Sequence, residues 1–428
     1  MDYYNIAKKY YLETNHYIDE RFLKNIVIYK MIASKTNFEL KLIDENKYKV
    51  IENSCKKILE NSDYEKILAF QTGSGTGINM KINDLIVKYA KKYYNFELNP
   101  NDDVNKSQSS NDVIPSILRI TLYLEKDRLL NNIQNLIKNL EKYSKKYKHY
   151  LKPGRTHLRD ALPVTFGLEL FSYYLKLDED YKNILYSFEN LKELPVGGTA
   201  VGTGILSHEN FKNLFIKNLN SFYNSDFVMM RDPGKKMKFV SDITFLLNSI
   251  SNFCLDIIKI SNDFRLMFSG PFSGINEIYL KNIEIEGSSI MPGKINPVNL
   301  ESIILGCTFA RNLSRISEDS SLIGEFELSM SFPLQMYISI QALDIAVESA
   351  IKLNKFLDSF VPNKKRSEYI AIHNPEIFTI LREKLPYKDV SKIIKNINEE
   401  NIHQIFKKYK INEKEIKRKI LDLIDKIY

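Results

Sequence analysis

The chain has 428 residues, of which 44% are apolar and 27% are charged. This balance is ordinary for a soluble folded protein, so it favours neither a disordered chain nor a membrane protein. A chain of this length exceeds one compact core, and about three domains or one elongated domain are expected.

No membrane or export segment is predicted. The longest largely apolar run extends only from Ile303 to Ala310, whereas a helix that spans a bilayer needs about 20 apolar residues. The first 30 residues contain four acidic side chains and no uninterrupted apolar stretch, which argues against a secretory or transit peptide. We therefore expect a cytoplasmic protein.

The formal net charge of +8 raises the question of a nucleic-acid partner. The lysines, however, are spread along the chain and alternate with Asp and Glu. A modest positive field of this kind would equally attract a small dianion. No nucleic-acid partner is therefore predicted.

The cysteines and histidines indicate neither a disulfide framework nor a metal centre. Cys55, Cys254 and Cys307 are odd in number and lie in helical patterns, as expected for buried thiols in a reducing compartment. The six histidines show no ligand spacing in the sequence. We expect no metal and no cofactor.

The predicted elements are almost all helices. Residues 1–103 are expected to form a smaller helical domain that ends at the turn-rich sequence Asn-Pro-Asn-Asp, residues 99–102. Five long amphipathic helices follow, because apolar residues recur at spacings of three and four. They are expected at residues 129–147, 170–191, 243–258, 297 to about 316, and 333–350.

Long helices with a period near 3.5 residues pack side by side at shallow angles. Residues 104–356 are thus expected to form a central five-helix bundle, and residues 357–428 a small, Lys-rich helical domain. The fold class is all-α with three helical domains. Broad apolar faces on several helices favour association into a closed oligomer of dihedral symmetry, such as a tetramer.

The most informative segment is GSSIMPGKINP, residues 287–297. It places two serine hydroxyls, the ammonium of Lys294 and the carboxamide of Asn296 on one short loop. Asn296 followed by Pro297 is typical of an N-cap and the first helical residue. The loop is therefore expected to end at the positive pole of a helix, which with Lys294 would stabilise a developing carboxylate charge.

This segment resembles the signature of the fumarase/aspartase superfamily, whose lyases eliminate water, ammonia or another nitrogen leaving group from beside a carboxylate. Four further segments resemble blocks of the same family and occur in its order. They are TGSGT at 72–76, VNKSQSSND at 104–112, GRTHL at 154–158 and GGTAVGTG at 197–204. The resemblance implies a homotetramer in which loops of three subunits build each active site around a small dicarboxylate.

The resemblance also implies roles for individual residues. Ser288 matches the catalytic base, His157 the proton donor to the leaving group, and Glu301 the acid that orients the histidine. The predicted substrate-binding positions are Ser74, Thr76, Ser109, Ser110, Asn111, Thr156, Lys294 and Asn296. Alternatively, the serines, threonines and asparagines are caps and turns, and Glu301 simply favours a helix N-terminus.

Within the family, His157 and Gly293 resemble fumarases, whereas aspartases usually carry glutamine and alanine there. We therefore expect elimination of water from malate to give fumarate through a carbanion with a dianionic carboxylate. The alternatives are an aspartate ammonia-lyase or another lyase of the superfamily, and, in a different class, a noncatalytic helical scaffold or nucleic-acid-binding protein.

Four positions depart from the fumarase pattern. Gly77-Ile78 replaces a more polar pair, Asn99 stands where many members have the histidine of a second anion site, Phe272 replaces an arginine, and Asn276 resembles aspartases.

Overall fold

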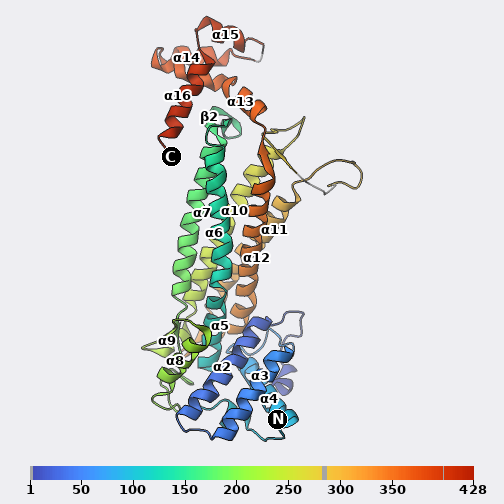
Figure 1. Ribbon diagram of the computed structural model, residues 1–428, viewed down its shortest axis with the longest axis vertical. Helices are drawn as coiled ribbons and strands as arrows, with labels where there is room; N and C mark the ends of the chain where they lie inside the picture. The colour runs from blue at the N-terminus through green and yellow to red at the C-terminus, as the bar shows by residue number, and fades with distance from the viewer. Residues whose placement is uncertain (1–2, 282–286, 399) are drawn as a thin grey trace. The chain divides into compact units, whose positions relative to one another are not determined.

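A computed structural model of the chain describes residues 3–281, 287–398 and 400–428. These residues are mainly helical, which confirms the predicted all-α class (Figure 1). In the described ranges the strands are short and form four two-stranded sheets. The pairs are β1 (Leu151–Thr156) with β2 (Arg159–Thr165), β3 (Glu193–Leu194) with β4 (Val228–Met229), β5 (Ile278–Leu280) with β8 (Phe360–Pro362), and β6 (Gly324–Glu325) with β7 (Leu328–Ser329). Only β3 and β4 pair in parallel.

The five predicted long helices are all present. They are α6 (Lys126–Lys146), α7 (Phe166–Glu189), α10 (Ser241–Phe268), α11 (Val298–Ser320) and α12 (Phe332–Ser359). Their predicted apolar positions are largely buried, including Leu136 in α6 and Ile250 in α10. Helix α10 also has the length and composition that crossing a membrane requires, and half of its most apolar window is buried.

The chain divides into two compact units. Unit 1 comprises Met1–Asn131, Asp180–Leu255 and Cys307–Val347, and unit 2 comprises Asn132–Glu179, Asp256–Gly306 and Glu348–Tyr428. Each long helix contributes residues to both units. Because this division follows contacts and not stretches of sequence, the three-domain organisation with boundaries near 103 and 356 stays a prediction.

Unit 1 contains the shorter helices of the N-terminal half. They are α1 (Tyr3–Lys8), α2 (Glu20–Glu39), α3 (Glu45–Asn61), α4 (Thr76–Tyr94), the π-helical turn η1 (Pro100–Val104), α5 (Ser110–Leu124), α8 (Phe211–Tyr223) and α9 (Pro233–Lys238). Helix α2 packs against α3, α5 and α8 and buries Phe22, Ile26 and Tyr29. Asn99 accepts two backbone N–H bonds at the start of η1, so its carboxamide oxygen serves the turn expected there.

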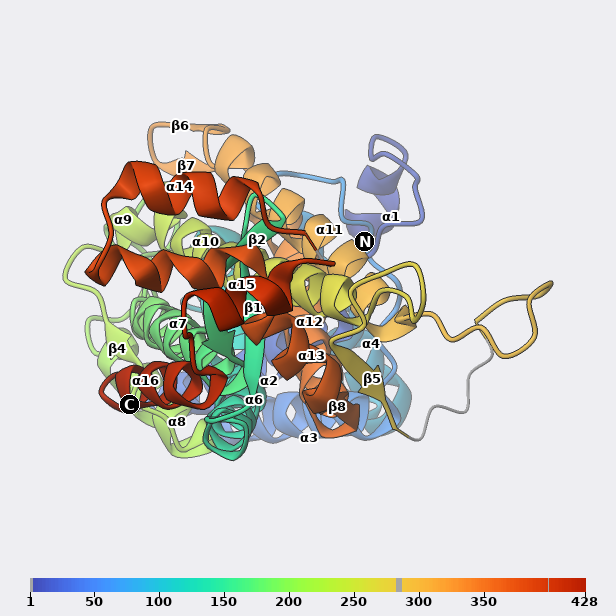
Figure 2. The same cartoon turned by 90° about the horizontal axis from the view of Figure 1, so that it is seen from above.

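Unit 2 includes the C-terminal helices, seen from above in Figure 2. They are α13 (Lys364–Ile372), the 3₁₀ helix η2 (Pro375–Glu383), α14 (Tyr387–Lys395), α15 (Ile402–Lys408) and α16 (Glu413–Asp425). Phe378, Val390 and Phe406 lie in their shared core, together with Leu151 of β1. Helix α13 packs on β1, so this small core continues onto the β1–β2 hairpin.

A buried ionic cluster joins three elements of unit 1. Arg119 in α5 has no exposed surface and binds both carboxylate oxygens of Asp242 at 2.8 and 2.9 Å. Lys236 of α9 donates to the same carboxylate at 2.6 Å. Burial acts to raise the pKa of Asp242, but the charges and hydrogen bonds of Arg119 and Lys236 outweigh it and the pKa is lowered.

We expect Asp242→Asn to lower the free energy of unfolding by about 3–5 kcal/mol, because it leaves the guanidinium of Arg119 buried without its counter-charge. Chemical denaturation would measure this loss. Asp344→Asn is the matched control: Asp344 also pairs with two arginines, Arg21 and Arg128, but in a solvated setting, so a loss of about 0–1 kcal/mol is expected.

The effect of Asp242→Asn should depend on pH. A carboxyl whose folded pKa is depressed stabilises the fold above its unfolded pKa of about 3.9, and that stabilisation is lost as the pH falls through the folded value. The difference between wild type and Asp242→Asn should therefore shrink below about pH 4. If Asp242→Asn and Asp344→Asn lowered the free energy of unfolding equally at neutral pH, the buried cluster would contribute no more to stability than the solvated one.

Candidate active site

The predicted site residues form two groups, one in each unit. Unit 1 holds Ser74, Thr76, Ser109, Ser110 and Asn111. Unit 2 holds Thr156, His157, Ser288, Lys294, Asn296 and Glu301.

In unit 1, Ser74 and Thr76 lie at the N-terminus of α4. Their hydroxyl oxygens are 2.7 Å apart. Gly75 between them is the N-cap residue and has a φ of +73°, a conformation that favours glycine. The turn at 72–76 thus presents two hydroxyls beside the first backbone N–H groups of a helix, an arrangement suited to binding an anion.

Ser109, Ser110 and Asn111 lie at the N-terminus of α5. Ser109 and Asp112 form a capping box, in which the side chain of each residue accepts the backbone N–H of the other. Asn79 of α4 donates to the Ser110 hydroxyl at 3.1 Å. The N-terminal turns of α4 and α5 are therefore joined directly.

The glycine-rich loop at 197–204 docks on the same end of α5. The amide of Thr199 donates to the carboxylate of Asp112 at 2.9 Å, and Asn111 donates to the carbonyl of Ala200 at 2.9 Å. Three segments that are far apart in the sequence thus converge in unit 1. The hydrogen bond to this loop fixes the position of the Asn111 carboxamide.

The sequence reasoning missed Lys30. Its ammonium is fully buried in α2 and donates to Asn105 at 2.7 Å and to Gln108 at 3.0 Å, both within the block at 104–112. Burial lowers the pKa of Lys30, and the nearby charge of Asp112 partly opposes this shift. The signal was present in the sequence, because Lys30 falls on the apolar stripe of α2 with Ile26 and Ala33.

In unit 2, Thr156 is the last residue of β1, and His157 lies on the tight turn between β1 and β2. His157 and Leu158 have φ values of +55° and +57°, as in a two-residue hairpin turn. Both His157 and Thr156 are exposed, so the turn presents the imidazole to solvent.

Buried Glu277 fixes the base of this hairpin. It forms ion pairs with Arg155, and with Lys152 at 3.3 Å. A cavity of about 650 Å³ adjoins the hairpin, with Arg155, His157 and Tyr173 in its lining. The hairpin that carries the imidazole is therefore held by ion pairs, and the imidazole borders a cavity.

Hydrogen bonds within the signature loop close it on itself. The amide of Gly287 donates to the carbonyl of Lys294 at 2.8 Å, and the Asn296 carboxamide donates back to the carbonyl of Gly287. The Ser288 hydroxyl oxygen accepts the amides of Met291, at 3.0 Å, and Ile290, at 3.4 Å. Donors of this kind stabilise an oxygen anion, which is what a serine base requires.

The predicted cap of the following helix is wrong by one residue. Helix α11 starts at Val298, and the carbonyl of Pro297 accepts the amide of Glu301 at 3.2 Å, so Pro297 occupies the N-cap position. Asn296 does not cap the helix because its side chain closes the loop. The loop nevertheless ends at a helix N-terminus, as expected.

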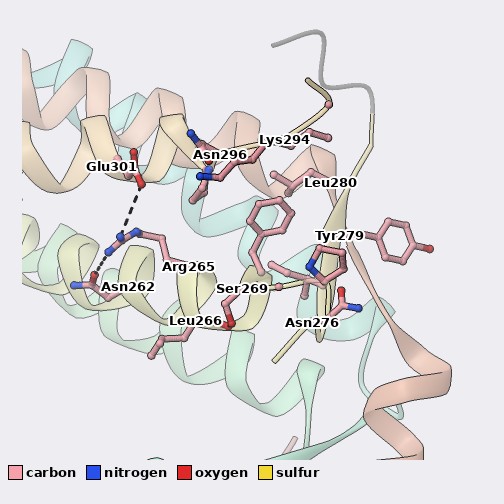
Figure 3. Close-up of a pocket in the computed structure, with 17 residues that line it drawn as sticks. Asn262, Arg265, Leu266, Ser269, Asn276, Tyr279, Leu280, Lys294, Asn296 and Glu301 are labelled. Carbon is pink, nitrogen blue, oxygen red and sulfur yellow. Dashed lines mark hydrogen bonds and ion pairs between the residues drawn. The ribbon is translucent and has the colours of Figure 1, made fainter. Parts of the chain in front are cut away.

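Lys294, Asn296 and Glu301 line one cavity of about 780 Å³ (Figure 3). Across it, Arg265 of α10 forms an ion pair with Glu301 at 3.8 Å. Among the described residues of this single chain, no hydrogen bond joins Glu301 to His157. Their predicted pairing stays a prediction. Phe272, the residue that replaces an arginine of the fumarase pattern, is 99% exposed.

A model of a lyase family matches residues 2–311 of the chain. The chain belongs to this lyase family. Curated relatives agree: the lyase is 36% identical to the class II fumarate hydratase of Saccharolobus solfataricus, over 99% of this chain and 98% of the relative. It is also 31% identical to an aspartate ammonia-lyase of Helicobacter pylori, over 92% of this chain and 86% of the relative.

Solved structures share the fold of the lyase. A class II fumarase from Schistosoma mansoni superposes with a TM-score of 0.86 and 23% identity, over 97% of this chain and 91% of that one. A cobalt-bound fumarate lyase:delta crystallin from Brucella melitensis gives a TM-score of 0.90 and 24% identity, over 100% of this chain and 95% of that one. The predicted membership of the fumarase/aspartase superfamily is confirmed.

Proposed function

We propose that this lyase is a class II fumarate hydratase that interconverts L-malate and fumarate. The observation that carries the proposal is the closed loop at 287–296, where two backbone amides point at the Ser288 oxygen and Lys294 and Asn296 face a cavity. The class II fumarate hydratases among the curated relatives support it, since two of them are 36% identical to this chain.

The difficult step is the removal of a weakly acidic proton from the carbon beside a carboxylate. In the proposed mechanism the Ser288 oxyanion takes this proton, and the electron pair moves into the carboxylate, which gains a second negative charge. Lys294 and Asn296 stabilise that charge. The C–O bond then breaks, His157 protonates the departing hydroxide, and water and fumarate are formed.

The turns of unit 1 supply the remaining substrate contacts in this proposal. Ser74, Thr76, Ser109, Ser110 and Asn111 stand at two helix N-termini, where backbone N–H groups and hydroxyls favour carboxylates. Thr156, beside His157, is the corresponding contact on the hairpin.

We propose that the enzyme acts as a homotetramer in which loops of three copies complete each site. Single-chain geometry supports this, because Glu301 faces Arg265 and not His157. Helix α11 also exposes Leu305, Phe309 and Ile316, at 73%, 51% and 40%. Large apolar side chains exposed along one helix are typical of an interface.

A cytoplasmic location and cofactor-free chemistry belong to the same proposal. All three cysteines are buried free thiols, which suits a reducing compartment. Aspartate ammonia-lyase remains the second candidate because one curated relative has that activity. The histidine at 157 and the glycine at 293 favour water over ammonia as the leaving group.

The direct test is an assay of purified protein without added cofactor. We expect L-malate and fumarate to interconvert, followed by the absorbance of fumarate, because the proposed site requires only protein groups. L-aspartate is assayed in parallel for ammonia release. Ammonia release without turnover of malate would make the protein an aspartase, and no reaction with either substrate would favour the noncatalytic alternative.

Ser288→Ala tests the base. We expect the turnover number to fall by about 10²–10⁴, the typical contribution of a positioned base, while binding of a dicarboxylate, measured by calorimetry, is retained because Lys294 and Asn296 remain. Ser289→Ala is the matched control, since the neighbouring hydroxyl has no assigned proton transfer, and it should lose little activity. Similar losses in both variants would refute the base assignment.

The composite site can be tested by mixing two inactive variants. Ser288→Ala and His157→Asn each disable one group, but a hybrid tetramer should contain some sites with an intact serine from one copy and an intact histidine from another. For random equal mixing, roughly a quarter of the sites are intact, so about a quarter of the wild-type activity should return.

The control for the mixing experiment is each variant refolded alone, which should stay inactive. Light scattering would establish that hybrids have the size of the wild-type assembly. Hybrids of full size that remain inactive would show that both groups of a site come from the same copy.

A further inference from the structure

Three potential metal ligands meet among the C-terminal helices of unit 2, outside the proposed active site. His373 follows α13, His403 lies in α15, and Glu413 is the first residue of α16. One ligand atom from each residue lies within 4.8 Å of the others. Sequence spacing did not indicate this group because the three residues come from different helices or from a helix end.

The hydrogen bonding of His373 leaves one ring nitrogen suited to a metal. Its Nδ1 atom is 2.9 Å from the carbonyl oxygen of Tyr369. A carbonyl oxygen only accepts, so Nδ1 carries the proton and the other nitrogen, Nε2, has the lone pair in the neutral ring. A backbone carbonyl that orients an imidazole in this way is typical of metal-binding histidines.

The distance between His373 and Glu413 fits two ligands of one ion. Nε2 of His373 lies 3.3 Å from Oε1 of Glu413. A charge-assisted hydrogen bond between these atoms would be about 2.7–2.9 Å long. Two ligands of a tetrahedral zinc ion, with bonds of about 2.0–2.2 Å, lie about 3.3–3.5 Å apart.

His403 supplies a third donor that a simple ion pair does not need. Its ring lies 5.0 Å from the ring of His373, at an angle of 60°. Two imidazoles and a carboxylate are a ligand set that suits zinc, with water as a fourth ligand. We propose that His373, His403 and Glu413 bind a zinc ion that ties α15 and α16 to the end of α13.

The surroundings set the expected strength of this site. A cavity of about 1000 Å³ beside it is lined by His373 and Glu413 and by Lys364, Lys365, Arg366, Lys414 and Lys417. These positive charges oppose a cation, although Lys417 is paired with Glu368. With three protein ligands and partial exposure, the site binds zinc more weakly than a closed four-ligand site.

Titration of the full-length protein with zinc chloride tests the site, after chelator treatment and removal of the chelator. Calorimetry should show one zinc ion bound per chain. His403→Gln, a change at an exposed side chain, should weaken binding by about tenfold or more, because it removes a direct ligand. His149→Gln is the matched control: His149 also faces a carboxylate, that of Asp425 at 2.9 Å. Among the described residues no third metal ligand meets this pair, so this variant should bind zinc like wild type.

Hydrogen exchange gives a second measure. Zinc should slow amide exchange in α15 and α16 of the wild-type protein and leave His403→Gln unchanged. Malate turnover of His403→Gln should equal that of wild type, which separates this site from the proposed active site and shows that the variant is folded. Absence of zinc binding, or equal binding by wild type and His403→Gln, would overturn the proposal and leave His373 and Glu413 as an ion pair.

Discussion

A serine hydroxyl can remove a proton from carbon only where its oxygen anion is stabilised, and the loop at 287–297 meets this constraint for the base role proposed for Ser288. The loop folds back so that the amides of Ile290 and Met291 reach the oxygen of Ser288. It can do so because Gly287 leaves room: a Cβ atom there would lie 2.7 Å from the amide nitrogen of Asn296. The carboxamide of Asn296 then closes the turn. In the same loop, Lys294 lines the cavity.

In unit 1, hydrogen bonds from buried polar side chains hold the turns at the N-termini of α4 and α5 in shape. Helix N-termini offer unpaired N–H groups, but a binding turn is useful only if it keeps its shape when the ligand is absent. Here Asn79 holds Ser110, and Asp112 holds both its own helix cap and the amide of Thr199. Lys30 supports the preceding residues from within the core. Buried polar groups thus fix the turns, at the expense of placing charges where burial opposes ionisation.

Local features made much of this predictable. The long helices follow from the spacing of apolar residues, since a periodic stripe must be buried whatever it packs against. The turns proposed to bind substrate follow from short segments whose glycines, serines and asparagines are needed for local geometry. The N-cap of α11 was missed because Asn296 is a favourable cap by composition, yet its carboxamide has a competing partner nine residues earlier, in Gly287.

The remaining features depend on contacts between distant segments. Arg265 pairs with Glu301, and Glu277 pairs with both Lys152 and Arg155. These contacts arise from the packing of distant segments, which no local pattern encodes. The group of His373, His403 and Glu413 is of the same kind. To predict such pairs, one must know which helix faces meet. The local patterns of one sequence do not give that information.

The distribution of the site residues bears on why this protein would need to assemble. His157 and Glu301 line two different cavities. No hydrogen bond joins the two side chains within the described part of one chain. In the proposed tetramer the carboxylate that orients the histidine comes from another copy, and the proton donor then acquires its proper tautomer on association. The exposed face of α11 that carries Leu305 and Phe309 begins one turn beyond Glu301 on the same helix. Burial of that face in the interface of the proposed tetramer would carry the carboxylate toward a neighbouring subunit, so that the hydrophobic free energy of assembly would also position the proposed pair of Glu301 and His157.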